Sequence, residues 1–180
     1  LNIAKNDTLT IKMVNDDEIY YRHNLRRSSH KYEVEVDGVT KVYSNYVKVD
    51  VKKSNSNEAY FILQKESKGK SKNSANKNAE KVEYKFEIID NTIVLDAYYL
   101  SEFKNMWKDE EVNITFYIPE GNTVYFDYTV RNFLYNVDND EDIYDKDMVN
   151  HHFKMNAETL ECTDCEKETE EENIIEQESI

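Results

Sequence analysis

Glycine and proline are scarce in this sequence, whose 180 residues include three glycines and one proline. Collagen-like, glycine-rich and proline-rich chains are therefore excluded. Gly38, Gly69 and Gly121 stand far apart, which also excludes a glycine-rich loop that cradles phosphate. No apolar run approaches the length of a membrane-spanning helix, about 18 residues. Because the G-x-S-x-G and H-E-x-x-H motifs of hydrolases are also missing, we expect no enzymatic activity.

Negative charge is unevenly distributed along the chain. The formal charge is −14, and residues 138–180 carry −13 of it, with 16 acidic residues against three lysines. The first 137 residues are therefore almost neutral, and nucleic acid is not an expected partner of so acidic a chain. We expect three regions: a mainly-β body over 1–137, an acidic connection over 138–165 that ends in a CxxC motif, and a disordered acidic tail over 166–180.

Alternation of apolar and polar residues predicts a series of short strands, of which 8–14, 47–51 and 112–118 are the clearest. A turn at 54–57 leads from 47–51 into a strand over 60–63, and we expect these two strands to pair. Further strands are predicted over 34–36, 42–43, 82–88, 92–97 and 124–130, with turn signals at 37–38, 90–91 and 119–122.

One helix is predicted over residues 72–82, where Ala75, Ala79 and Val82 form a narrow stripe of small apolar side chains. The fold class is therefore mainly β, with roughly eight short strands and one short helix. A sandwich, a roll and a short β-solenoid all agree with this pattern, because no repeat of fixed period is visible.

The motif Cys162-Thr163-Asp164-Cys165 is the most chemically suggestive part of the sequence. It fits a disulfide, a plain pair of thiols, or half of a zinc site completed by His151 and His152. Acidic neighbours disfavour a thiolate, so thiol–disulfide catalysis is not expected. A single CxxC motif is weak support for zinc, and we expect a disulfide or a thiol pair and no cofactor.

Acidic residues offer two further candidate sites, and both are weak. Asp138, Asp140 and Asp142 alternate as in a calcium loop, but Ile143 and Val149 stand where an EF-hand needs glycine and glutamate. We expect a solvated acidic connection there. The adjacent pair at 110–111 is not distinctive enough to indicate a glycosidase, which needs two carboxylates that converge in a cleft.

Aromatic residues are the main material for a core, with 14 tyrosines, seven phenylalanines and one tryptophan. Tyr98, Tyr99, Phe103 and Trp107 lie close together in sequence. They fit either a loop that covers the end of the sheet or an exposed interaction surface for a protein or glycan, and we favour the first interpretation.

Lysines form one basic stretch, which either attracts anionic lipids and cell-envelope polymers or balances nearby acids. Its members are Lys65, Lys68, Lys70, Lys72, Lys77 and Lys81.

Five segments in a fixed order carry a resemblance to a known family: LQKESKGKSKNSANKNAEKVEYKF (63–86), NTIVLDAYYL (91–100), KDEEVNITFYIPEGNTVYFD (108–127), YDKDMV (144–149) and LECTDC (160–165). From about Thr8 to Cys165 the chain resembles the C-terminal region of PspC-domain (phage shock protein C-like) membrane proteins of Bacteroidetes, which are related to stress-responsive transcriptional regulators. More distantly, its strands and turns are similar to those of adhesin-like domains built as β-solenoids.

The resemblance implies a membrane-embedded PspC domain ahead of this segment, and a location on the periplasmic side of the inner membrane. The chain begins at Leu1 without a methionine, so we expect a fragment or a processed chain. The implied function is a non-enzymatic sensing or interaction domain of an envelope-stress protein, with a protein or cell-envelope partner. An adhesin-like structural module that binds glycan or protein is the first alternative, and a hydrolase is the second.

Overall fold

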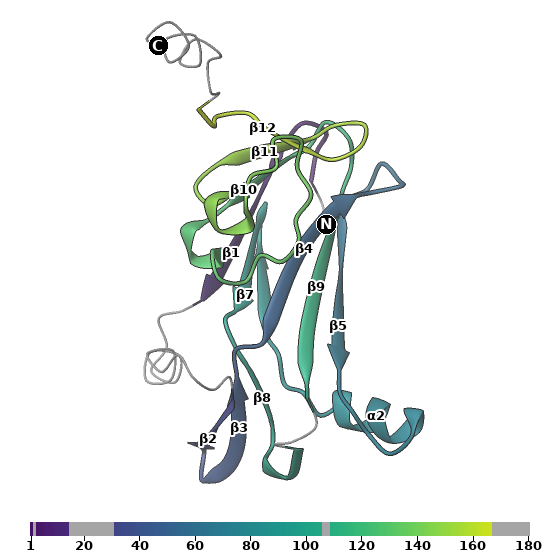
Figure 1. Cartoon of the computed structure of the whole chain (residues 1–180), viewed down its shortest axis with the longest axis vertical. Coiled ribbons are helices and arrows are strands. Elements are labelled where there is room, and N and C mark those ends of the chain that lie inside the picture. Colours follow the sequence, from purple (N-terminus) through teal and green to yellow (C-terminus); the bar gives the residue numbers. More distant parts are fainter. Residues whose placement is uncertain (2, 15–30, 106–108, 167–180) are drawn as a thin grey trace, which may run out of the picture.

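The computed structural model describes residues 1, 3–14, 31–105 and 109–166 (Figure 1). Within these ranges, twelve strands form three sheets and one α-helix is present, so the mainly-β prediction is confirmed. No helix in this part of the chain is long and apolar enough to cross a membrane.

The largest sheet has six strands in the order β12-β11-β10-β1-β7-β6. Their bounds are β1 Thr8–Val14, β6 Phe86–Ile89, β7 Thr92–Asp96, β10 Thr123–Phe126, β11 His152–Met155 and β12 Leu160–Cys162. The second sheet is β4-β9-β5, and these strands lie side by side in Figure 1. Their bounds are β4 Val47–Lys53, β5 Tyr60–Glu66 and β9 Glu111–Ile118.

The third sheet, β2-β3-β8, lies beyond the lower ends of the other two, near the helix α2 (Figure 1). Its strands are β2 Lys31–Val36, β3 Val39–Ser44 and β8 Tyr99–Glu102, and α2 spans Lys72–Ala79. The β2–β3 hairpin turns at Asp37 and Gly38, both of which have a positive φ, as the twist of a two-residue hairpin requires. Three short 3₁₀ turns complete the described elements: η1 Phe103–Asn105, η2 Tyr128–Val130 and η3 Asp145–Asp147.

Parallel pairing defines the architecture. β1 runs parallel to both β7 and β10, and β4 runs parallel to β9 and, through a single bridge at Val49, to Leu134. Two parallel neighbours in a sheet need a crossover connection between them. Here the crossover passes through the opposite sheet: the chain leaves β9, forms β10 in the six-stranded sheet, and returns to β4 at Leu134. The chain therefore winds between two sheets: β1 lies between β7 and β10, and β4 lies between β9 and the bridge to Leu134, all of which come later in the sequence.

The core lies between these two sheets. Alternate residues of β1, β4 and β9 point inward and are buried, which is the period of a half-buried strand. The inward set includes Leu9, Ile11 and Met13 on one side, and Val49, Val51, Ile114, Phe116 and Ile118 on the other.

One expected pairing is wrong. We expected the strand at 47–51 to pair with the strand at 60–63, but β9 lies between β4 and β5 and pairs with both. The connection is not a tight hairpin: Ser54 is buried, its hydroxyl donates to the Glu58 carbonyl, and its backbone N–H donates to Ile118. This anchored turn carries the chain past the position of β9, so that β4 and β5 lie on opposite sides of β9.

Two predicted elements are shorter than expected. The helix begins after Ser71, whose hydroxyl accepts the Ser74 N–H, and it ends at Ala79 instead of residue 82. The strand predicted over 82–88 is reduced to β6, and Glu83 forms only an isolated bridge with Leu100. Val82 is nevertheless buried.

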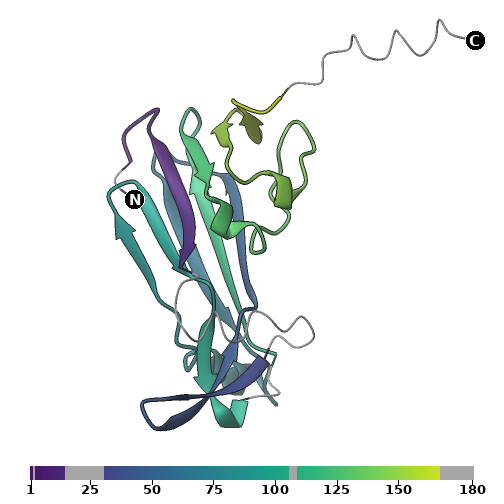
Figure 2. The same cartoon turned by 90° about the vertical axis from the view of Figure 1, so that its left-hand side faces the viewer.

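The strand predicted over 124–130 also ends early, at Phe126. The Asp127 carboxylate accepts the Thr129 N–H at 2.9 Å and so turns the chain into η2. After this point, residues 130–166 form what we call the cap: a long irregular segment followed by the β11–β12 hairpin. The segment described above as an acidic connection thus contributes two strands to the six-stranded sheet. In Figure 2 the cap, in green to yellow, lies at the opposite end of the molecule from the β2–β3 hairpin.

Candidate functional site

Cys162 and Cys165 are joined by a disulfide at the end of β12, within the cap. The β11–β12 hairpin places Cys162 opposite Phe153, and both residues are buried. The hairpin turn is held by Asn156, whose side-chain oxygen accepts the N–H groups of Glu158 and Thr159 at 2.8 Å each. Cys162 is therefore the last residue of a strand whose turn and pairing with β11 are both fixed, and Cys165 follows just after the strand.

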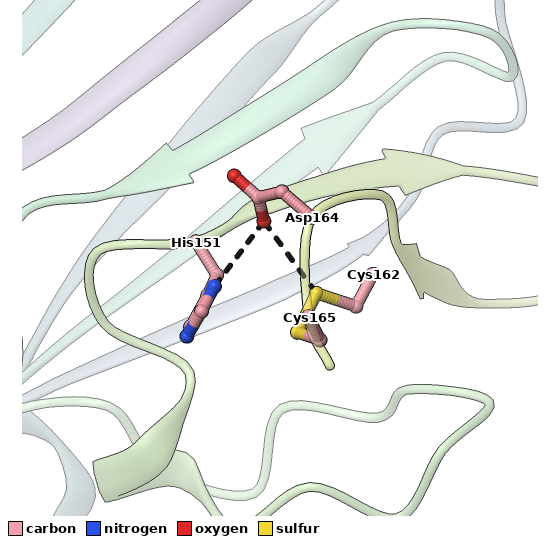
Figure 3. Close-up of side chains that lie close together, drawn as sticks. All are labelled: His151, Cys162, Asp164 and Cys165. Atoms are coloured by element: carbon pink, nitrogen blue, oxygen red, sulfur yellow. Dashed lines mark hydrogen bonds and ion pairs between the residues drawn. A yellow bond between two sulfur atoms is a disulfide. The ribbon is translucent and has the colours of Figure 1, made fainter. Parts of the chain in front are cut away.

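Two histidines converge on Asp164, the acid inside the CxxC loop, and Figure 3 shows one of them, His151. Nδ1 of His151 lies 3.2 Å from one oxygen of Asp164, and Nδ1 of His152 lies 2.7 Å from the other. The backbone N–H of His152 also donates to this carboxylate, at 2.9 Å. Sγ of Cys162 is 3.7 Å from the same group, a contact that would become a hydrogen bond if the sulfur carried a proton.

The electrostatics of this cluster favour an ionised Asp164. Burial alone would raise the pKa of its carboxyl, but hydrogen bonds from the His152 backbone and from both imidazole rings outweigh burial and hold the pKa below its ordinary value. A second acid, Glu141, accepts the backbone N–H of Cys162 at 3.2 Å. The disulfide thus lies against two carboxylates.

The side chains of His151, Cys162, Asp164 and Cys165 each bring one potential ligand atom within 4.8 Å of the others. Sequence analysis selected the cysteines and histidines but did not foresee the part of Asp164. Neither cysteine can act as a thiolate ligand while the disulfide is intact. In the structure, the cluster is therefore a cross-linked loop with a histidine–carboxylate network attached.

The aromatic candidates are divided between core and surface. Tyr99 is 1% exposed, so its place in an exposed interaction surface is wrong; its hydroxyl donates to the Glu110 carbonyl, and burial raises its pKa. Tyr98 is half-buried and stacks on Tyr43 at a centroid distance of 4.9 Å, whereas Phe103 is 46% exposed. Trp107 lies outside the described residues.

The acids considered for calcium help to build turns. The Asp140 carboxylate accepts a hydrogen bond from the side-chain amide of Asn156. The side chain of the neighbouring Asn139 accepts the N–H of Ile143 and donates to its carbonyl. Asp142 has a positive φ of 54°. Asp140 thus serves as a hydrogen-bond acceptor in the cap, and Asp142 lies at a turn.

The glutamates at 110–111 do not converge. Glu110 is buried, accepts the Ser101 hydroxyl at 2.8 Å, and lies 3.8 Å from the Lys31 ammonium. Glu111 points the other way and pairs with Lys48 at 3.0 Å. Adjacent residues in extended backbone face opposite directions, so this pair cannot act as the two carboxylates of a glycosidase.

A groove of about 430 Å³ opens beside Glu110, and sequence analysis did not predict it. It lies where β3, β5 and β9 come together, and Lys31, Ser44, Tyr46, Lys68 and Glu111 contribute to its lining. No sequence motif marks it, since its residues come from segments that are far apart in the chain.

Three members of the basic stretch make contacts within the chain. Lys65 donates to the Val82 carbonyl at 2.8 Å, Lys68 pairs with Asp109 at 2.6 Å, and Lys81 pairs with Glu102 at 3.1 Å. The acidic tail lies outside the described residues, apart from Glu166. These contacts favour the interpretation that the lysines balance nearby acids.

Apolar side chains are exposed at the end of the stack opposite the cap. We call this surface the open edge and define it as β5 and β6, each of which is the last described strand of its sheet. Phe86, Ile88 and Ile89 on β6 are 40%, 51% and 54% exposed, and Ile62 on β5 is 42% exposed. Phe86 meets Phe61 of β5 edge-on, at a centroid distance of 5.2 Å. Phe86 and Ile88 lie opposite the buried Leu95 and Ile93, on the core side of β6, so the core is left partly uncovered there. Ile62 and Ile89 lie opposite Thr115 and Thr92, on the outer faces of the two sheets.

Comparison with known proteins identifies the family. Residues 34–168 match the family described as the ToastRack domain found in some PspC proteins, whose fold is β-solenoid-like, as is the winding described above. No match was found among curated proteins or solved structures. Because the match covers most of the chain, this protein belongs to the family of ToastRack domains associated with PspC.

Proposed function

We propose that this domain is a non-enzymatic interaction domain of a PspC-type membrane protein, exposed on the periplasmic side of the inner membrane, where it takes part in sensing envelope stress. Family membership supports the association with a membrane protein. The disulfide between Cys162 and Cys165 supports an oxidising, extracytoplasmic location. The divergence of Glu110 and Glu111 supports a role without hydrolysis.

The open edge is the observation that carries this proposal. An edge strand presents a row of backbone donors and acceptors that another strand can use, and soluble proteins normally protect such edges with charge, proline or a covering element. Instead, β6 has the sequence Phe86-Glu87-Ile88-Ile89, and all four residues are exposed. Apolar surface and an available strand edge therefore coincide, as in proteins that bind an extended peptide as an added strand.

The expected partner is a protein segment in extended conformation. Ile88 and Ile89 are aliphatic and cannot form the hydrogen bonds that a glycan would require, which favours a protein over a sugar ligand. Tyr60 and Ile88 line one shallow hollow at this end and offer a place for an apolar side chain. The family match gives no support to the adhesin-like alternative.

Site-specific crosslinking in the full-length membrane protein tests the proposal. A photoreactive residue at position 60 should yield a crosslinked product with a second polypeptide in intact cells. The change Ile88→Lys should reduce that product at least tenfold, because a lysine places charge in the apolar contact. Val39→Lys is the matched control, since Val39 is 56% exposed on the distant β2–β3 hairpin. Neither change should alter stability by more than about 0.5 kcal/mol.

Two outcomes would contradict the proposal. One is a crosslinked product that Ile88→Lys and Val39→Lys reduce equally, because the contact would then not depend on the open edge. The other is crosslinking only to a second copy of the same chain, which would make the edge a self-association surface. Circular dichroism of each purified variant should accompany the experiment, so that loss of folding is not mistaken for loss of the contact.

A further inference from the structure

The cluster in the cap combines two sulfurs, an imidazole and a carboxylate, a set of ligands that suits zinc. We propose that His151, Cys162, Asp164 and Cys165 form a redox-gated zinc site, which is closed while the cysteines are joined and binds Zn²⁺ once they are reduced. The site lies in the cap, at the opposite end of the stack from the open edge. It needs no protein partner, and a negative result for the proposed function would leave it unaffected.

The geometry needs little change to accommodate the metal. One ligand atom from each of the four side chains already lies within 4.8 Å of the others. Zinc binds thiolates at about 2.3 Å, so two sulfurs on a tetrahedral ion stand roughly 3.8 Å apart. The Cα atoms of the two cysteines are 5.7 Å apart, so side-chain rotation after reduction can provide that separation without moving the backbone.

Neighbouring groups hold the oxygen and nitrogen ligands in place. His152 contacts Asp164 with both its ring and its backbone N–H, at 2.7 and 2.9 Å. The ring of His152 in turn packs against Tyr125, at a centroid distance of 4.7 Å. Metal sites commonly depend on such outer contacts to orient their ligands. We therefore assign His152 a positioning role and His151 the direct one.

The local charge favours a cation over free thiolates. Glu141 accepts the N–H of the first cysteine, and Glu161, Asp164 and Glu166 lie within or beside the CxxC loop. Lys154, across the hairpin from Glu161, is the nearest lysine in the strand register. These acids attract a divalent ion, which takes the place of the thiol protons when the Zn–S bonds form.

Reduction of the disulfide comes before metal binding. A dithiol reductant transfers two electrons and two protons: the bond between the cysteine sulfurs breaks, two S–H groups form, and the reductant becomes a disulfide. Zn²⁺ then forms two Zn–S bonds and releases two protons. His151 supplies a nitrogen and Asp164 an oxygen, which completes a four-coordinate site. Sites with thiolate and imidazole ligands of this kind favour zinc.

Cobalt titration of the whole 180-residue chain tests the site, because Co²⁺ reports thiolate ligation by a charge-transfer band and tetrahedral geometry by visible absorption. The reduced chain, freed of reductant under anaerobic conditions, should bind one Co²⁺, and Zn²⁺ should displace it. The oxidised chain should show neither band. Loss of an outer contact typically weakens metal binding about 10–100-fold, so His151→Ala and Asp164→Asn, which each remove a direct ligand, should weaken it by at least that much. The double change of both cysteines to serine should abolish the charge-transfer band. Glu158→Gln, an exposed acid in the same hairpin, is the matched control.

The proposal is overturned if the reduced chain gives no charge-transfer band, or if His151→Ala binds cobalt as tightly as the unchanged chain. Equal binding by oxidised and reduced chains would overturn it as well, since the sulfurs would then play no part. Near-ultraviolet circular dichroism of each reduced variant verifies that the cap is still folded. A reduced cap that is folded and binds no metal would leave the disulfide with a purely structural role.

Discussion

At the cap, Phe153, Leu160 and Met148 are fully buried, whereas at the open edge Phe86 and Ile88 keep 40% and 51% of their surface exposed. Both groups belong to strands or loops that close the same two-sheet core. In stacked β-architectures the terminal units normally carry a polar outer face that shields the core from water. Here one end has such a cover, built from residues 130–166, and the other ends in apolar edge strands. This difference between the two ends is the basis for proposing that the open edge receives a partner strand.

Acidic residues mark the same contrast. The cap uses them as hydrogen-bond acceptors: Asp145 accepts the N–H groups of Asn136 and Val137, and Glu141 accepts that of Cys162. Part of the negative charge of residues 138–180 therefore lies in the folded cap and not only in the tail that follows it. At the open edge, by contrast, β6 has the single acid Glu87 among three apolar residues.

The largest effect should come from removing a buried aromatic at the cap. Phe153 is fully buried and packs against Phe126 at a centroid distance of 5.6 Å. Phe153→Ala should lower the free energy of unfolding by about 3–5 kcal/mol. Phe86→Ala, the same change at the open edge, should cost no more than about 1.5 kcal/mol, because Phe86 is already partly in water. Urea denaturation with the disulfide intact measures both. Equal losses would show that the cap and the open edge contribute equally to the free energy of unfolding, which would contradict the difference in burial between them.

Much of the sheet structure could be predicted because alternation is a local signal. The strands around 8–14, 47–51 and 112–118 follow from this alternation, and the turn at Asp37 and Gly38 follows from the Asp-Gly pair itself. Pairing is not local, however, and the expected partner of β4 was wrong because β9 inserts between β4 and β5. The insertion of β1 between β7 and β10 also explains why no fixed repeat is visible, since neighbouring strands in space are distant in sequence.

The cap was harder to predict than the body. β11 and β12 have only four and three residues, too few for a clear period, and the acids around them resemble a solvated segment. The CxxC motif was visible, but the contact between Asp164 and the two histidines depends on the β11–β12 pairing. Burial of Tyr99 likewise depends on the pairing of β8 with β3, which sequence alone did not indicate.

Loss of the disulfide should have an intermediate effect that is confined to the cap. The change of Cys162 and Cys165 to serine removes a cross-link that closes a very short loop, for which chain entropy predicts a loss of about 2 kcal/mol. Hydrogen exchange should accelerate in β11 and β12, while β5 and β6 should be unchanged except through global unfolding. Faster exchange in β5 of similar size would show that the two ends are coupled, and the distinction between them would then fail.

The smallest effect should come from the charge of Asp164, and it should depend on pH. Because folding holds the pKa of this carboxyl below its ordinary value of about 3.9, ionisation stabilises the folded state above that pH, and the contribution disappears as the pH falls through the folded-state pKa. The side chain is 41% exposed, so the contribution should stay below about 1 kcal/mol. Asp164→Asn should therefore melt earlier than the unchanged chain at pH 5 and above, and the difference in Tm should shrink below about pH 4. Glu158→Gln should show no such trend, and a difference that persists at the lowest pH would mean that the shape of Asp164, and not its charge, stabilises the cap.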